Sequence, residues 1–265
     1  MHLKIRHRTE YRYETPVRYS IQELRLTPPD VAGQKIDKWK VSTPIKASTS
    51  LDAFGNMYSV FVQESSYTSM MIEAEGDVDT EDAFEFIDDP KAVSPYHLLQ
   101  QTNLTEPTAE MLEFFSASLP KHNSVDEVMK LAAAVQSAIL YFPGQTNFAT
   151  TAAQSFAMKS GVCQDHAHIM LGLCRASNIP ARYVSGYFFA EDSPNLASHA
   201  WIDFCADIDK GLWLSIDITN ACFTDARHVR LAIGRDYYSA APVKGVRSGG
   251  VGEELSASIS ITQVN

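Results

Sequence analysis

Strict alternation of polar and apolar residues near the start of the chain is the feature that most limits how it can fold. From residue 3 to residue 13 the odd positions are Leu, Ile, His, Thr, Tyr and Tyr, and the even positions are Lys, Arg or Glu. A period of two is that of a β-strand with one buried face. The basic face is expected to be solvated, because the whole chain carries a formal net charge of −10.

More strand-like segments follow this first strand. Residues rich in strand-forming side chains and bounded by turn residues occur at 19–26, 36–41, 58–62 and 69–74. Short, mixed strands of this kind are typical of a sandwich or a curled sheet. The acidic stretch at 75–90 is typical of a surface connection. We therefore predict a β-sandwich-like module over residues 1–90 and a second unit over residues 91–265.

The second unit begins with helix signals and ends with strand signals. Ser124 with Glu127, and Thr151 with Gln154, have the spacing of a capping box at a helix start. Gly161 is expected to end the helix that begins after Thr151. Strand patterns dominate the rest of the chain, so we predict an α+β core with helices over residues 105–175 and an antiparallel sheet over residues 180–265.

Cys163 follows this glycine and begins a helical pattern. The apolar face of that helix starts at Cys163 and continues through Ala167, Met170, Leu171 and Cys174. Unpaired N–H groups and the helix dipole at a helix N-terminus stabilise a thiolate, the reactive form of cysteine. A buried thiol that only packs is the alternative, since free cysteine is among the most buried residue types. Position alone does not decide between a nucleophile and a packing residue.

Charge and cysteine content narrow the classes of protein to which the chain can belong. Its 265 residues contain 22 Lys and Arg against 32 Asp and Glu, which disfavours nucleic acids and anionic membranes as partners. Four cysteines are too few for a disulfide scaffold and lack paired zinc spacing. We find no signal-like N-terminus and no apolar run of membrane-spanning length, and we expect a cytoplasmic protein without a metal ion or other cofactor.

A predicted hairpin brings a histidine and an aspartate together. If the two strands 199–204 and 212–218 turn near residue 208, Asp203 faces Trp213 and His199 faces Asp217. Residues opposite each other on one face have Cβ atoms roughly 4.5–5.5 Å apart. An imidazole with an orienting carboxylate is what a nucleophilic cysteine needs as its base. We therefore predict Cys163 as nucleophile, His199 as general acid and base, and Asp217 as orienter, with Asp203 as the alternative orienter.

Other residues compete for roles in such a site. His166 lies one helical turn after Cys163 and is an alternative base. A metal site built from Cys163, His166, His168 and Cys174 is disfavoured, because these residues lack the spacing of a structural zinc site. Arg182 and Tyr187 are candidates for a substrate groove, although packing is the commoner role of a tyrosine in a sheet.

Several strings resemble the bacterial branch of the transglutaminase-like family, within the papain-like thiol enzymes. The strings are residues 161–168, 179–187, 199–201 and 213–220, which contain the cysteine, the histidine and the aspartate in that order. Residues 228–237 also resemble this branch. Residues 11–17 and 23–28 resemble the N-terminal region that often precedes the catalytic core in bacterial members. The resemblance covers nearly the whole chain.

This resemblance implies a fold and a chemistry. A helix that bears Cys163 is expected to pack on an antiparallel sheet that bears His199 and Asp217, and the thiolate is expected to attack a carboxamide and form a thioester. Two positions depart from the family pattern: Ile218 stands where proline is usual, and His166 stands where an aromatic residue is frequent. No dedicated calcium loop is visible, so calcium dependence is not expected.

The sequence as a whole predicts a thiol-dependent acyl-transfer enzyme that acts on amide or isopeptide bonds of a peptide or protein. Hydrolysis is favoured over cross-linking, because no feature that would recognise an acceptor amine is evident. The Cys163 backbone N–H is the expected oxyanion donor, Gln154 is a candidate second donor, and Gln164 and Trp201 are candidates for the groove. A true transglutaminase and a non-catalytic peptide-binding or scaffold protein are the alternatives.

Overall fold

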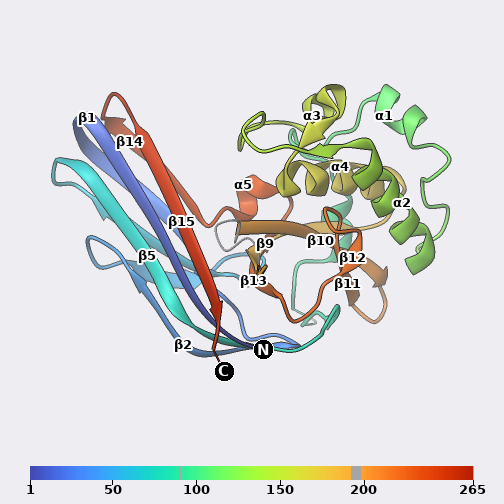
Figure 1. Ribbon diagram of the computed structural model, residues 1–265, viewed down its shortest axis with the longest axis horizontal. Helices are drawn as coiled ribbons and strands as arrows, with labels where there is room; N and C mark the ends of the chain where they lie inside the picture. Colours follow the sequence, from blue (N-terminus) through green and yellow to red (C-terminus); the bar gives the residue numbers. More distant parts are fainter. Residues whose placement is uncertain (90, 192–197, 265) are drawn as a thin grey trace.

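Two antiparallel sheets, a short parallel pair of strands and a group of helices make up the protein (Figure 1). This computed structural model describes residues 1–89, 91–191 and 198–264. The long strands of the first sheet form one wall of the molecule in Figure 1, and the helices α1 to α4 gather on its opposite side. The short parallel pair is β7 (Leu140–Tyr141) with β8 (Ser160–Gly161).

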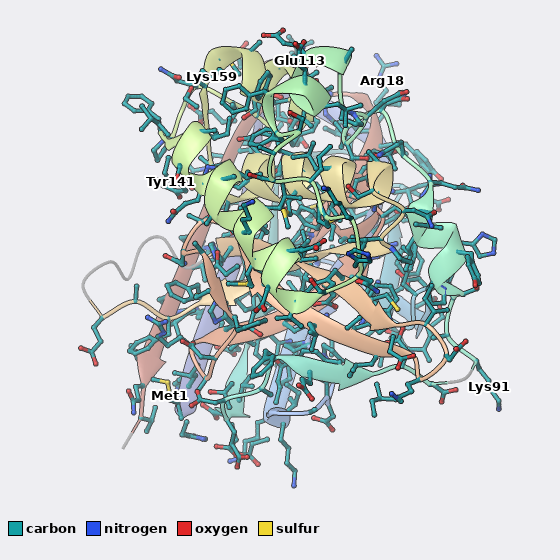
Figure 2. All side chains as sticks on the ribbon, turned by 90° about the vertical axis from the view of Figure 1, so that its right-hand side faces the viewer. Met1, Arg18, Lys91, Glu113, Tyr141 and Lys159 are labelled. Carbon is teal, nitrogen blue, oxygen red and sulfur yellow. The ribbon has the colours of Figure 1, made fainter. Side chains whose placement is uncertain are left out.

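The first sheet is built on β1 (His2–Thr27). The predicted alternation is confirmed, because Leu3 and Ile5 are fully buried whereas Lys4 and Arg6 are exposed. The first half of β1 pairs with β5 and β15, and its second half pairs with β4 and β14. Figure 2 labels Met1 and Arg18 at opposite ends of the molecule, so the first half of β1 spans most of its height. The other strands are β2 (Gln34–Ser42), β3 (Ser48–Leu51), β4 (Met57–Gln63), β5 (Tyr67–Thr80), β14 (Val243–Gly249) and β15 (Glu254–Gln263).

The sandwich-like module predicted for residues 1–90 does not form as a unit of its own. Within the described residues, β1 to β5 lie in one sheet, and β14 and β15 join it by pairing with β1. These last two strands were expected in the sheet of residues 180–265. The layer that covers the first sheet is the second sheet, since Leu3 and Ile72 pack in one cluster with Val229 and Leu231. Local periodicity identifies a strand but does not specify its distant partner.

The second sheet carries two residues of the predicted site, His199 and Asp217. Its strands follow the order β12, β11, β10, β9 and β13, and β6 pairs with β11. All of these pairs are antiparallel. The strands are β6 (Glu85–Ile87), β9 (Ala181–Phe188), β10 (Ser198–Asp207), β11 (Leu212–Asp217), β12 (Cys222–Phe223) and β13 (His228–Gly234).

The helix α4 (Cys163–Ala176) lies at the centre of the core. Every residue from Asp165 to Arg175 is buried. Its apolar side chains share one cluster with Val135 of α2 and Ile202 of β10. A Cβ at Gly172 would lie 2.1 Å from the Thr105 carbonyl oxygen, so only glycine allows the chain before α1 to approach α4 this closely. The core helix is thereby fixed against both the sheet and the preceding segment.

Among the remaining helices, α2 and α3 pack against α4. The predicted caps are confirmed, since the side chains of Ser124 and Thr151 accept hydrogen bonds from Glu127 N–H and Gln154 N–H. No helix in the described ranges combines the length and the apolar character that a membrane crossing requires. The helices are η1 (Pro95–Leu99), α1 (Ala109–Phe114), α2 (Val125–Ala138), α3 (Ala152–Met158) and α5 (Tyr237–Ala240).

Candidate active site

Cys163 is the first residue of α4, and the turn before this helix sets its position. Asp165 Oδ2 accepts hydrogen bonds from the Val162 backbone N–H at 2.8 Å and from Thr146 Oγ1 at 2.7 Å. A Cβ at Gly161 would lie 2.6 Å from Asp165 Cβ, so this position requires glycine for space. The left-handed residue that ends α3 is Lys159, with a φ of 54°, and not Gly161 as expected.

His199 of β10 and Asp217 of β11 are in direct contact. His199 Nε2 lies 2.7 Å from Asp217 Oδ2. The predicted register is wrong, because Asp203 pairs with Ser215, two residues from its expected partner. A shift of two residues keeps every side chain on its own face of the sheet. His199 and Asp217 are therefore diagonal neighbours, and their side chains are long enough to meet.

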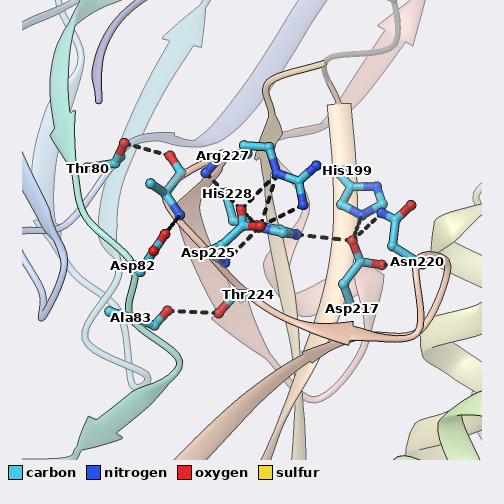
Figure 3. A network of polar contacts seen from close by, with 11 residues as sticks. Thr80, Asp82, Ala83, His199, Asp217, Asn220, Thr224, Asp225, Arg227 and His228 are labelled. Atoms are coloured by element: carbon cyan, nitrogen blue, oxygen red, sulfur yellow. Dashed lines mark hydrogen bonds and ion pairs between the residues drawn. The ribbon is translucent and has the colours of Figure 1, made fainter. Parts of the chain in front are cut away.

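Asp217 is fully buried and is held by several donors (Figure 3). Asn220 donates to Oδ2 through its Nδ2 at 2.6 Å and to Oδ1 through its backbone N–H at 3.1 Å. His228 Nε2 lies 3.0 Å from Oδ2. Burial would raise the pKa of Asp217, but hydrogen bonds from His199 and His228 hold this pKa well below its usual range. Asp217 is therefore ionised, and its hydrogen bonds hold the carboxylate in one orientation.

Cys163 is the other titratable group that acts on His199. Burial would lower the pKa of His199, but the hydrogen bond with Asp217 and the nearby Cys163 raise this pKa from 6.5 to about 10. Because Asp217 occupies Nε2, Nδ1 is the nitrogen left for the thiol. An imidazolium in this position stabilises a neighbouring thiolate. The structure thus brings His199 into contact with Asp217, and Cys163 and His199 line one cavity.

His166, the rival base, is engaged on both ring nitrogens. Nε2 lies 3.1 Å from the Ile139 carbonyl oxygen and donates to it, and Nδ1 lies 3.0 Å from Thr219 Oγ1. Burial lowers the pKa of His166. A neutral histidine with no free nitrogen is a packing and hydrogen-bonding residue, so this geometry does not support His166 as the base.

Asp203, the rival orienter, is neutralised by two arginines. Arg182 Nε donates to Asp203 Oδ2 at 2.7 Å, and Arg230 donates to both carboxylate oxygens at 2.7 Å. Burial would raise the pKa of Asp203, but Arg230 and Arg182 lower it to about 2. Arg182 also binds Asp88 and lines a different cavity from Cys163. The structure therefore does not place Arg182 in the predicted groove.

The other predicted groove residues divide into two sets. Gln164 and Tyr187 line the same cavity as Cys163 and His199. Gln154 instead accepts from the Thr151 N–H in the capping box of α3, and it does not line this cavity. Trp201 is buried edge-on against the His228 ring, with the ring centroids 5.3 Å apart. Gln154 and Trp201 thus stabilise neighbouring structure and do not reach the cavity.

The set that the sequence disfavours as a metal site, Cys163, His166, His168 and Cys174, is not a group of close potential ligands within the described residues. Among the described residues, the group of potential ligands that lies close enough for a metal ion is His199, Asp217 and His228, with ligand atoms within 4.8 Å of one another. Their 2.7 Å and 3.0 Å separations are hydrogen-bond distances, so hydrogen bonding already satisfies these atoms.

The other cysteines of the chain have raised pKa values. Burial raises the pKa of Cys174 to about 12. Burial likewise raises the pKa of Cys205 and of Cys222 to about 11.

Two residues that hold Asp217 were missed by sequence reasoning. Asn220 and His228 both lie within strings that resemble the family, yet no role could be assigned to them from the sequence. The position of His228 in the sequence, at the start of a strand, gives only a weak indication of its role, because its partner Asp217 is on another strand. The pairing depends on β13 and β11 lying in one sheet.

A cavity of about 370 Å³ opens onto Cys163 and His199. The core contributes Tyr183 and Tyr187 of β9 to its lining, among other residues. The first sheet contributes the opposite wall from β1 and β15, through His7, Thr9, Tyr11, Leu255, Ala257 and Ile259. A thiol, a base and a carboxylate beside a cavity form an arrangement suited to nucleophilic attack on a carbonyl group.

Comparison with known proteins agrees with this arrangement. Residues 3–79 match the bacterial transglutaminase-like N-terminal region, and residues 115–218 match the transglutaminase-like superfamily. Uncharacterized proteins of Mycobacterium leprae (strain TN) and of Mycobacterium tuberculosis (strain ATCC 25618 / H37Rv) are each 28% identical to the chain. The alignments cover 99% of this chain and 99% of the first relative, and 92% of this chain and 86% of the second.

A solved structure shares the fold over nearly the whole chain. It is the crystal structure of a protein from Cytophaga hutchinsonii that is described as a candidate cysteine protease. The two chains are 18% identical, the alignment covers 99% of this chain and 98% of the other, and the TM-score is 0.71. At this identity the likeness shows a common fold.

Proposed function

We propose that this chain, which joins a bacterial transglutaminase-like N-terminal region to a transglutaminase-like core, is a thiol enzyme that transfers acyl groups from amide or isopeptide bonds. The observation that carries the proposal is the position of His199. This residue is hydrogen bonded to the Asp217 carboxylate and lines one cavity together with Cys163. A purely structural fold does not need these three groups together.

The proposed reaction has two halves. In the first, the Cys163 thiolate attacks the carbonyl carbon, and the C=O electron pair moves onto oxygen. His199 then gives its Nδ1 proton to the leaving nitrogen as the C–N bond breaks, which leaves a thioester on Cys163. In the second half, His199 takes a proton from water as the water oxygen attacks the thioester, and the thiolate leaves.

The groups around the thiol support these steps. The Cys163 N–H lies in the first turn of α4, where backbone N–H groups have no partner within the helix, and it can donate to the oxyanion. Asp217 keeps the proton on Nε2 of His199 and so leaves Nδ1 facing the thiol. The raised pKa of His199 supports its imidazolium form at neutral pH.

Hydrolysis is the outcome we favour over transfer to an amine. Both reactions share every step up to the thioester, and water is abundant. The described lining of the cavity holds no carboxylate that would bind an acceptor ammonium group.

The proposal is tested with p-nitrophenyl acetate, which releases nitrophenolate when it acylates a thiol. We expect a burst equal to one acetyl group per protein, with the added mass on Cys163, and no burst in Cys163→Ala. An equal burst in Cys163→Ala would refute the proposal. Addition of glycine methyl ester during turnover of an acylated sample distinguishes water from amine acceptors. A non-catalytic binding protein would show no burst in the wild type.

Reagent selectivity gives a second test that needs no substrate. Iodoacetamide at pH 6 is expected to modify Cys163 before any other cysteine, because burial raises the pKa values of Cys174, Cys205 and Cys222. Peptide mapping by mass spectrometry identifies the modified residue. Modification of Cys163 no faster than that of Cys222 would contradict an activated thiolate.

A further inference from the structure

The cavity over Cys163 is lined without formal charge, apart from the proposed catalytic pair. None of its described lining residues is Lys, Arg, Asp or Glu. These four types account for 22 plus 32 of the 265 residues of the chain. Instead, five tyrosines line the cavity: Tyr11, Tyr141, Tyr183, Tyr187 and Tyr237.

The one additional histidine in the lining is also neutral. His7 is 5% exposed, and its Nδ1 lies 3.0 Å from the Tyr187 hydroxyl oxygen. Burial lowers the pKa of His7 from 6.5 to about 4. At neutral pH the described walls therefore offer hydroxyl groups, aromatic rings and aliphatic side chains, and no counter-ion for a charged group.

The first sheet supplies much of this neutral surface. Thr9 and Tyr11 of β1 line the cavity together with Leu255, Ala257 and Ile259 of β15. Thr9 and Ala257 are paired across the two strands. The intervening Ser256 and Ser258 do not line the cavity, as expected from the alternation of side chains along a strand. These lining residues thus belong to the first sheet, so they can be substituted without changing Cys163, His199 or Asp217.

We propose that this cavity selects acyl donors whose groups beside the reacting amide are uncharged, aromatic or aliphatic, and that β1 and β15 impose this preference. The proposal rests on Cys163 being the proposed nucleophile. A carboxylate or ammonium group that entered the cavity would lose water, and outside the proposed catalytic pair the described lining offers no partner of opposite charge, which is unfavourable. Tyrosine rings and hydroxyls, by contrast, accommodate both apolar groups and neutral amides.

The first experiment uses three chloroacetamides that differ only in the N-substituent: butyl, 2-carboxyethyl and 3-aminopropyl. The labelling rate of Cys163 is measured by mass spectrometry at pH 7 and divided by the rate with 2-mercaptoethanol, which corrects for intrinsic reactivity. We expect the butyl reagent to exceed each charged reagent by about tenfold, equivalent to about 1.4 kcal/mol. Corrected rates that agree within about twofold would overturn the proposal.

The second experiment moves the charge to the wall. Ala257→Lys places an ammonium group in the lining, and Ser258→Lys places the same group on the other face of β15 as a matched control. Ala257→Gln controls for size. We expect Ala257→Lys to raise the ratio of 2-carboxyethyl to 3-aminopropyl labelling by about fivefold or more. Equal ratios in Ala257→Lys and Ser258→Lys would contradict the assignment of β15 as the selective wall.

These outcomes separate the selectivity from the proposed function. Loss of the p-nitrophenyl acetate burst in Cys163→Ala tests the nucleophile alone. If that burst depends on Cys163 but the three reagents label it equally, the thiol enzyme stands and the neutral cavity is refuted. If no burst occurs but labelling of Cys163 is selective, the cavity stands as a binding site and the enzyme is refuted.

A separate hydrogen-bond network connects the N-terminal region to Asp217 (Figure 3). The Asp225 N–H donates to His228 Nδ1 at 3.1 Å, while His228 Nε2 faces Asp217 Oδ2 at 3.0 Å. Because a carboxylate only accepts, Nε2 carries the hydrogen of this bond. His228 is 6% exposed, so the bond is shielded from water.

The segment around Asp225 is in turn hydrogen bonded to the last residue of β5 and to residues that follow it. Thr80 Oγ1 donates to the Ala226 carbonyl oxygen at 2.6 Å, and the Ala226 N–H donates to Asp82 Oδ1 at 3.0 Å. Thr224 Oγ1 donates to the Ala83 carbonyl oxygen at 3.0 Å. Figure 3 shows these contacts in sequence from Thr80 to Asp217.

We also infer that His228 is a positioning residue through which the N-terminal region fixes the orientation of Asp217. His228→Gln retains a side-chain N–H donor, whereas His228→Leu fills space without one. We expect His228→Leu to slow the p-nitrophenyl acetate burst by about tenfold and His228→Gln to restore it to within about threefold of wild type. A purely packing role reverses this order, because leucine then replaces the ring better than glutamine. Circular dichroism verifies that both variants fold.

Discussion

Two buried aspartates of the second sheet, Asp217 and Asp203, differ in the side chains that bind them. Both are fully buried, and both take a partner from β13: His228 binds Asp217, and Arg230 binds Asp203. His228 and Arg230 are two residues apart and so occupy the same side of the strand. The two aspartates therefore differ in the type of residue that β13 places beside each of them.

The consequence lies in whether the partner can change its charge. Arginine remains protonated at any pH at which the protein is folded, so Asp203 sits in a permanent ion-pair cluster. Histidine can gain or lose a proton, and the His199 partner of Asp217 lines one cavity with Cys163. One carboxylate stabilises the sheet, and the other is placed to orient a base. Substitutions at the two positions test this contrast directly.

Asp217→Asn has the largest expected effect. The substitution removes the negative charge that stabilises the imidazolium form of His199. It also removes the carboxylate that keeps a proton on Nε2 of the ring. We expect the rate of the p-nitrophenyl acetate burst to fall by about 10³- to 10⁴-fold, in line with the loss of an orienting carboxylate in a triad. Stopped-flow absorbance measures the burst. A variant that folds and retains more than about a tenth of the wild-type rate would exclude Asp217 as the orienter.

Asp203→Asn is expected to affect stability and not the thiol. It leaves Arg182 and Arg230 buried without their shared counter-ion, and breaking a buried pair in this way costs about 3–5 kcal/mol. Urea denaturation measures this free energy of unfolding. The burst rate of the folded fraction should stay within about twofold of wild type. A large loss of burst rate with unchanged stability would reverse the roles assigned to the two aspartates.

The stability of the protein above neutral pH should distinguish the cluster around Asp217 from the cluster around Asp203. The pKa of His199 is about 10 in the folded protein and 6.5 as its ordinary value, so the folded state holds a proton that the unfolded state releases between these pH values. Stability from this group is complete below pH 6.5 and is lost as the pH rises through 10. We expect a loss on the order of 2–4 kcal/mol.

His199→Gln is the control for this alkaline loss. Urea denaturation at intervals between pH 6.5 and pH 10 should show a flatter profile in the variant than in the wild type. Asp203→Asn should retain the wild-type slope, because it leaves His199 and its contact with Asp217 in place. A profile that is equally steep in His199→Gln would mean that another group causes the loss.

His166→Gln should have the smallest effect on the thiol. The amide can replace one of the two hydrogen bonds of the ring, to Ile139 or Thr219, and we expect a loss of stability of about 1 kcal/mol. The burst rate should change by less than about threefold. A loss as large as that of Asp217→Asn would return the role of base to His166.

The hairpin shows how far sequence reasoning can be carried. The predicted register was wrong by two residues, yet the contact between His199 and Asp217 is present. Alternation along a strand fixes which face a side chain occupies, and a shift of two residues preserves that face. The choice between Asp217 and Asp203 could not be made from the hairpin alone, because it depends on what β13 places beside each of them.

The N-terminal region shows where local pattern is insufficient. The alternation in residues 3–13 predicted a half-buried strand, and β1 has that form. It did not indicate that residues 254–263 would pair with that strand, because pairing across about 250 residues leaves no local periodic signal. This pairing brings Ala257 and Thr9 to the cavity, so the proposed selectivity was not visible in the sequence.

The sequence by itself identified the candidate residues for the chemistry and the local elements that hold them: a half-buried first strand, a helix that begins at Cys163, and two strands that bear His199 and Asp217. Capping residues, glycine and side-chain periodicity are local determinants, and they can be recognised in the chain. Only the tertiary structure decided which aspartate meets a histidine, why His166 is occupied elsewhere, and which strands close the cavity. These outcomes depend on contacts between distant segments, and packing of the complete fold selects them.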